Sequence, residues 1–170
     1  MGSDYRALSS TNLWALAEWA ASRGDAQRLQ LIGAAIRENR DSTKTRRDSL
    51  LGRIVDAHTA LVEGDTAVAV QRLSALVPNA THAELEWQPW EALAAERMTL
   101  ARLAYAQGRY RDAIRLAAEI DNPYPIAHLM YLRSSLELRA AAADAMDDLR
   151  GGGVYRLRLV QLEADSVRVP

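Results

Sequence analysis

Tight turns recur at nearly equal intervals along this chain. Gly24, Gly64 and Gly108 each separate two segments in which apolar residues return at helical spacing, and these turns lie 40 and 44 residues apart. Asp147 and Asp148 hold the next such position, 39 residues beyond Gly108. A helical hairpin leaves one apolar face uncovered until a neighbour of like shape packs against it. The intervals therefore predict a stack of about four antiparallel hairpins, or about eight helices.

Composition also favours an all-α fold. Alanine and leucine, both strong helix formers, are abundant, and the chain contains no phenylalanine and no cysteine. The absence of cysteine excludes disulfides and thiolate metal sites. The formal net charge of -1 argues against tight binding of nucleic acid, which needs a basic face that neutralises many phosphates. No apolar run reaches the roughly 20 residues that span a bilayer, so we expect no membrane segment and a cytoplasmic location.

The turns also set the predicted boundaries. Residues 1–9 are expected to be a tag or a disordered N-terminus, residues 10–163 a single domain, and residues 164–170 a tail. The hairpins are predicted at 10–39, 42–78, 81–121 and 124–163. The first helix of the third hairpin is predicted to run without a break over residues 90–107. Gly151–Gly153 stands where the last helix should begin, and glycine costs about 1 kcal/mol per residue inside a helix, so the sequence leaves open whether the fourth hairpin is regular.

The segment Leu100–Ile114, with the sequence LARLAYAQGRYRDAI, resembles the centre of a tetratricopeptide repeat (TPR). Its small residues let two helices pack closely, Gly108 turns the chain, and Tyr110 follows as the aromatic residue of the motif. Parts of the first two hairpins are similar to the same motif. The resemblance implies a right-handed stack of hairpins, a TPR-like α-solenoid of bacterial origin. The role it implies is that of an interaction or scaffolding module within a larger bacterial regulatory protein.

The first helix of each hairpin in a TPR-like domain lines a concave groove that receives a peptide or protein segment. The groove positions of the family fall on eight residues of this chain, namely Trp14, Glu18, Ile54, His58, Met98, Arg102, Tyr105 and Glu137. These side chains make a mixed wall, without the cluster of Lys and Arg that would hold a terminal carboxylate. We therefore expect a partner that offers both apolar anchors and a few charges.

Residues that could support catalysis or bind metal form no motif of characteristic spacing in the sequence. The three histidines, His58, His82 and His128, fall in different hairpins. Gly151–Gly153 lacks the Lys-Ser/Thr pair that completes a phosphate-binding loop. The sequence therefore predicts a protein that is not an enzyme and that holds no metal and no cofactor.

Two alternatives remain open. A small helical enzyme or ligand-binding domain would have its site near the insertion that contains Trp87 and Trp90. Its polar groups would be His82, Glu84 and Glu91, and their convergence around an enclosed cavity would favour this alternative. The other alternative is a homo-oligomer that forms through the uncovered faces of the terminal hairpins.

Overall fold

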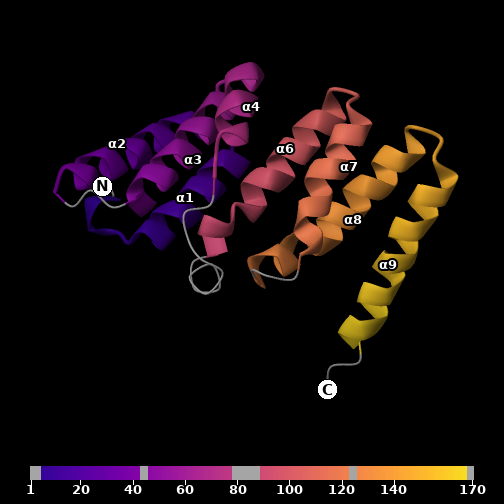
Figure 1. Cartoon of the computed structure of the whole chain (residues 1–170). Helices are drawn as coiled ribbons and strands as arrows, with labels where there is room; N and C mark the ends of the chain where they lie inside the picture. Colours follow the sequence, from indigo (N-terminus) through magenta and orange to yellow (C-terminus); the bar gives the residue numbers. More distant parts are fainter. Residues whose placement is uncertain (1–4, 43–45, 78–88, 123–125, 168–170) are drawn as a thin grey trace. The chain divides into compact units, whose positions relative to one another are not determined.

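The computed structural model describes residues 5–42, 46–77, 89–122 and 126–167. Eight α-helices and several short 3₁₀ helices make up this part of the chain, which contains no strand (Figure 1). The predicted all-α class is therefore confirmed. None of the described helices combines the length and the apolar character needed to cross a membrane. The chain divides into two compact units, Met1–Thr81 and His82–Pro170, which part between the second and third predicted hairpins.

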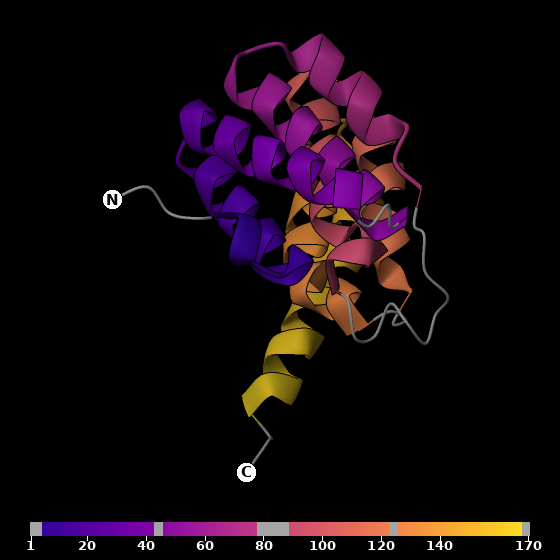
Figure 2. The same ribbon diagram turned by 90° about the vertical axis from the view of Figure 1, so that its left-hand side faces the viewer.

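The helices of the first unit pack as antiparallel neighbours (Figures 1 and 2). They are α1 (Ser10–Ser22), α2 (Ala26–Ser42), α3 (Arg46–Val62) and α4 (Thr66–Ser74). α1 and α2 form the first hairpin, α3 packs against both of them, and α4 returns along α3. Leu29, Ile32 and Leu51 are among the fully buried side chains of this unit.

The second unit has a similar arrangement (Figure 1). Its helices are α6 (Ala94–Ala106), α7 (Tyr110–Ala118) with its 3₁₀ extension η3 (Glu119–Asp121), α8 (Leu129–Asp144) and α9 (Leu149–Val167). α8 packs against both α6 and α7, and α9 returns along α8. Met98, Ala101 and Ile120 belong to the buried core of the unit, and Tyr131 and Leu132 of α8 pack against that core. In both units, therefore, the first helix of the second hairpin covers the hairpin before it.

One turn geometry closes all four hairpins. Each turn contains a residue of positive φ, called here the left-handed residue: Gly24 (67°), Gly64 (87°), Gly108 (72°) and Asp147 (58°). In every turn the N–H of the next residue donates to the carbonyl of an alanine five positions back, at 2.9 Å. The four alanines, all buried, are Ala20, Ala60, Ala104 and Ala143. This bond ends a helix in the manner of a Schellman motif, so the turns marked in the sequence are confirmed.

Aspartate caps three of the four helices that follow these turns. Asp25, Asp65 and Asp148 each accept a hydrogen bond from the N–H three residues on, at 2.9, 3.1 and 2.9 Å. Each cap satisfies an N–H group that the helix itself leaves without a partner, and such a cap stabilises a helix by about 1 kcal/mol. In the third hairpin Arg109 holds the same position and makes no side-chain cap. Turn and cap together give the hairpins a common local structure.

The prediction of an unbroken helix over residues 90–107 is wrong. The 3₁₀ helix η2 (Pro89–Ala92) comes first, and α6 begins only after Leu93. Leu93 has a φ of 59°, in the left-handed region, which interrupts the helical bonding. Nothing in the sequence marks this position, because leucine strongly prefers the right-handed helix.

The fourth hairpin is regular, a point that Gly151–Gly153 left open in the sequence. α9 runs through all three glycines. Gly152 is buried at the fifth position after the left-handed residue, the position that Ala69 and Ala113 occupy, also buried, in their own hairpins. A small residue is therefore a shared feature of this position in three hairpins, and glycine meets that requirement.

Both ends of the described chain contain more regular structure than predicted. Tyr5–Ala7 forms a short 3₁₀ helix within the segment expected to be disordered. α9 reaches Val167, so the helix extends into the predicted tail at 164–170. The first hairpin is also longer than its predicted end at residue 39, because α2 continues to Ser42.

Candidate functional site

Four of the predicted groove residues lie in the first unit, on α1 and α3. Trp14 and Glu18 are partly exposed on α1, whereas Ile54 and His58 of α3 are buried. The structure brings Glu18 and His58 together, with 2.8 Å between Oε1 of the glutamate and Nε2 of the histidine. Only 4% of the His58 side chain is exposed, so this pair is a contact that joins α1 to α3.

The other four predicted groove residues lie in the second unit, on α6 and α8. Met98 is buried in the core, and Arg102 is exposed. Tyr105 is half-buried and meets Tyr110 edge to face, with 5.3 Å between the ring centroids. Glu137 is exposed and forms an ion pair along its own helix. Arg102 forms no ion pair with any other residue in the described ranges, so its guanidinium remains available.

Three of these residues lie at the same distance from their turns but differ in burial. Ile54 and Met98 lie ten residues before the left-handed residue of their hairpins, and α8 packs against the core that contains Met98. Glu137 holds the same position in the last hairpin and is exposed. In the second unit this position is therefore buried at Met98, where the fourth hairpin packs on the third. Of the eight predicted residues, the exposed ones are Arg102 and Glu137, the partly exposed ones are Trp14, Glu18 and Tyr105, and the buried ones are Ile54, His58 and Met98.

A charged cluster in the second unit joins η3 to α8 and α9. Arg139 donates to both carboxylate oxygens of Asp121, at 2.8 and 2.6 Å, and Arg158 donates to the same two oxygens at 3.0 and 3.1 Å. The Arg139 side chain is 2% exposed, and its guanidinium lies 5.0 Å from the ring centroid of Tyr155. No pattern in the sequence indicates this cluster. Its members lie far apart in the chain and fit no motif.

These contacts control the ionisation of Asp121. The hydrogen bonds from Arg139 have the largest effect, and with those from Arg158 they outweigh burial and lower the pKa of Asp121 from 3.8 to about 2. The carboxylate of Asp121 therefore stays charged at all pH values well above this pKa. One anion held by two cations from different helices fixes the packing of the fourth hairpin against the third.

Of the residues named for the alternative site, only Trp90 and Glu91 fall within the described part of the chain, as does the separate histidine His128. His128 is buried with its Nδ1 3.1 Å from the carbonyl oxygen of Asn122, and burial is the main cause that lowers the pKa of His128. Trp90 and Glu91 are both buried. The other residues of the alternative site, His82, Glu84 and Trp87, lie outside the described residues.

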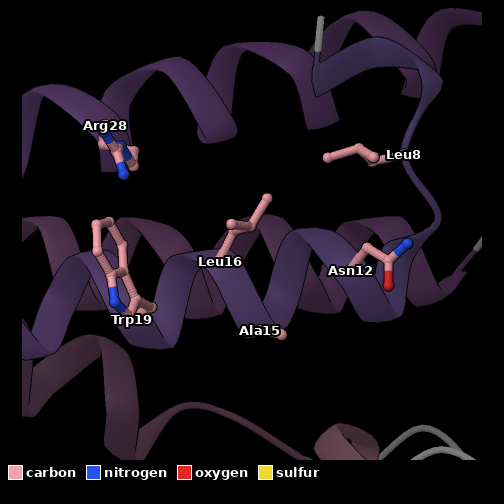
Figure 3. A pocket seen from close by; sticks show the side chains of 6 residues that line it. All are labelled: Leu8, Asn12, Ala15, Leu16, Trp19 and Arg28. Atoms are coloured by element: carbon pink, nitrogen blue, oxygen red, sulfur yellow. The ribbon is translucent and has the colours of Figure 1, made fainter. Parts of the chain in front are cut away.

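A pocket of about 630 Å³ opens on the first unit, beside α1 (Figure 3). Its lining residues are Leu8, Asn12, Ala15, Leu16, Trp19 and Arg28. Figure 3 shows Leu16 and Trp19 extending from α1 toward Leu8 and Arg28. Trp19 is 44% exposed, and the guanidinium carbon of Arg28 lies 4.7 Å from its ring centroid. Exposed indole under a cation is a favourable surface for contact with another molecule.

Comparison with known proteins finds no match for this chain among protein-family models, curated proteins or solved structures.

Proposed function

We propose that this chain is a TPR-like, right-handed stack of helical hairpins that binds another protein. The support for a repeat architecture is local and recurrent. All four turns share one hydrogen-bond pattern, and in each unit the first helix of one hairpin lies against the first helix of the other. Repeated units of this kind stack because each one covers the apolar face of the next.

The proposed binding surface is the side of the first helices that the hairpins leave open. Arg102 and Tyr105 on α6 carry the proposal, because both reach solvent at positions where the resemblance places the groove. A guanidinium and a phenol favour an acidic or carbonyl-rich segment with an apolar anchor. The module would act by binding alone, as a scaffold within a larger bacterial regulatory protein in the cytoplasm, and we propose no chemical step.

Charge reversal at Arg102 tests this surface. We expect Arg102→Glu to leave the melting temperature of the chain unchanged, because the side chain is exposed and makes no ion pair within the described residues. Proteins from a bacterial lysate that the wild-type chain retains should be lost from the variant. Affinity capture followed by mass spectrometry, with the binding of each recovered protein then measured in purified form, gives the readout.

The matched control is Arg111→Glu, which makes the same change at an exposed position on α7, the second helix of the same hairpin. This variant should retain the proteins that the wild type retains. Equal loss from both variants would show a nonspecific charge effect, and no loss from Arg102→Glu would place the binding surface elsewhere.

A further inference from the structure

α9 carries apolar side chains on two faces. One face packs on α8. Val154, Leu157 and Val160 follow one another at helical spacing on the other face, and they are 53%, 60% and 61% exposed. A helix that is apolar on both sides is typical of one that is covered on both sides. Among the described residues, no helix covers this second face.

Gly153 lies beside the face of α9 that carries Val154, Leu157 and Val160. No neighbouring atom of the described chain requires a glycine at this position. A side chain at Gly151 would collide with the capping Asp148, and a side chain at Gly152 would meet Asp144 and Arg156. A Cβ at Gly153 would meet nothing within 4 Å. Glycine inside a helix costs about 1 kcal/mol relative to alanine, so this position is one where the helix accepts a residue that does not favour it. Glycine allows another chain to approach the helix closely.

The pocket on α1 is the counterpart of a surface that is covered inside the chain. Counted from the left-handed residue of each hairpin, its α1 residues correspond to positions on α8. Asn12, Ala15, Leu16 and Trp19 correspond to Ser135, Leu138, Arg139 and Ala142. On α8 these positions face the preceding hairpin: Ser135 donates to the carbonyl of Ala117 at 2.7 Å, and Ala142 is fully buried. The α1 residues of the pocket therefore hold the positions that, on α8, pack against another hairpin.

The two junctions within the units share one register. Arg37 of α2 pairs with Asp56 of α3 at 3.5 Å, and Asp121 of η3 pairs with Arg139 of α8 at 2.6 Å. In both pairs the first residue is the thirteenth after its left-handed residue, and the second is the eighth before the next one. The signs of the charges are exchanged, but the positions are the same.

The same register can be applied to the two exposed ends. The thirteenth residue after Asp147 is Val160 on α9, and the eighth before Gly24 is Leu16 on α1. Three residues along each of the two antiparallel helices, which is nearly one helical turn, Leu157 falls opposite Trp19. At both positions, therefore, an apolar side chain of α9 would meet an apolar side chain of α1. At the first of these positions, the junctions inside the chain instead pair side chains of opposite charge.

We propose that copies of this chain associate head to tail, with α1 of one copy packed on α9 of the next. This interface is separate from the proposed groove on α6. Gly153 would lie opposite Arg23 of the other copy, at the positions where Gln30 and Glu63 meet at 2.9 Å in the first unit. The missing side chain of Gly153 leaves room for the long arginine side chain.

The interface is weaker than the junctions inside the chain. Glu137 of the fourth hairpin holds the position that Met98 holds in the third hairpin. Because Glu137 is charged, α8 would add little apolar contact to the interface with the next copy. Interfaces that bury less than roughly 1,200 Å² are generally weak and transient. We therefore expect association to become evident at micromolar concentrations or above.

Light scattering and sedimentation over a concentration series test the proposal. The mass of the wild type should rise with concentration, whereas Trp19→Glu and Leu157→Glu should each stay monomeric. An equimolar mixture of these two variants should form dimers, because Trp19→Glu keeps an intact α9 and Leu157→Glu keeps an intact α1. Val160→Glu should behave as Leu157→Glu does, and circular dichroism should show that each variant stays folded.

Different outcomes separate this arrangement from others. A wild type that is monomeric throughout the series overturns the proposal. Self-association of Trp19→Glu alone, with no rescue in the mixture, would instead show a symmetric contact between two α9 helices and would also overturn it. Arg102→Glu and Arg111→Glu should associate as the wild type does, so a failure of the proposed groove remains distinguishable from a failure of this interface.

Discussion

Replacement of Asp121 by asparagine is expected to lower the free energy of unfolding by about 2 to 4 kcal/mol. The substitution keeps the size of the side chain and removes its charge. Arg139, of which only 2% of the side chain is exposed, would then hold a buried charge with no carboxylate against it. Arg158 would lose its bidentate partner as well. Urea denaturation at neutral pH, followed by circular dichroism, measures the change.

Asp112→Asn is the matched control. Asp112 pairs with Arg109 at 3.1 Å, and both side chains are well exposed. Exposed pairs contribute about 0 to 1 kcal/mol, so this variant should unfold close to the wild type. Equal destabilisation by the two substitutions would contradict the role assigned to burial of Arg139.

The stabilisation from Asp121 should also disappear in acid. Because the folded-state pKa is lowered from 3.8 to about 2, the stabilising effect is complete above pH 4 and is lost as the pH falls toward 2. The difference in unfolding free energy between wild type and Asp121→Asn should shrink over the same range. A difference that stays constant down to pH 2 would show that the carboxylate is not held by the two arginines.

The turns could be read from the sequence because their cause is local. Glycine is the residue that best accepts the left-handed conformation, and the aspartate that follows it supplies the N-terminal cap of the next helix. Gly24 and Gly64 therefore indicate both where one helix ends and where the next one begins. Asp147 lacks that signal, and its position is indicated by the break between two segments of helical spacing and by the interval from Gly108. Local chemistry and periodicity together were sufficient for the all-α class and for the four turns.

The candidate site was less predictable because burial depends on neighbours. The position ten residues before the turn is buried at Met98, where α8 packs against the core, and exposed at Glu137, on which no described helix packs. The cluster around Arg139 depends on the register of α8 on η3, which a single helix does not reveal. The backbone at Leu93 could not be predicted for a similar reason: leucine on its own prefers the right-handed conformation, but in the fold it adopts the left-handed one.

Substitutions at the left-handed residues of two hairpins should change the free energy of unfolding in opposite directions. Gly108→Val is expected to lower the free energy of unfolding by about 1 to 3 kcal/mol, because a β-branched residue is strained at a φ of 72°. The strain is confined to the backbone, since a Cβ at Gly108 would meet nothing within 4 Å. Asp147→Gly should raise the free energy of unfolding by about 0.5 kcal/mol, because glycine relieves the strain at 58° but gains freedom in the unfolded chain.

This pair of variants tests whether the fourth turn is equivalent to the others. Both residues lie in the same hydrogen-bond pattern, in which the following N–H donates across the turn at 2.9 Å. If the turns are equivalent, glycine is the better residue at both, and the two substitutions shift the urea midpoint in opposite directions. A loss of stability in Asp147→Gly would mean that the aspartate side chain itself holds the last turn together. The repeat would then comprise three equivalent turns and one of a different kind, and the correspondence between α1 and α8 would lose its reference point.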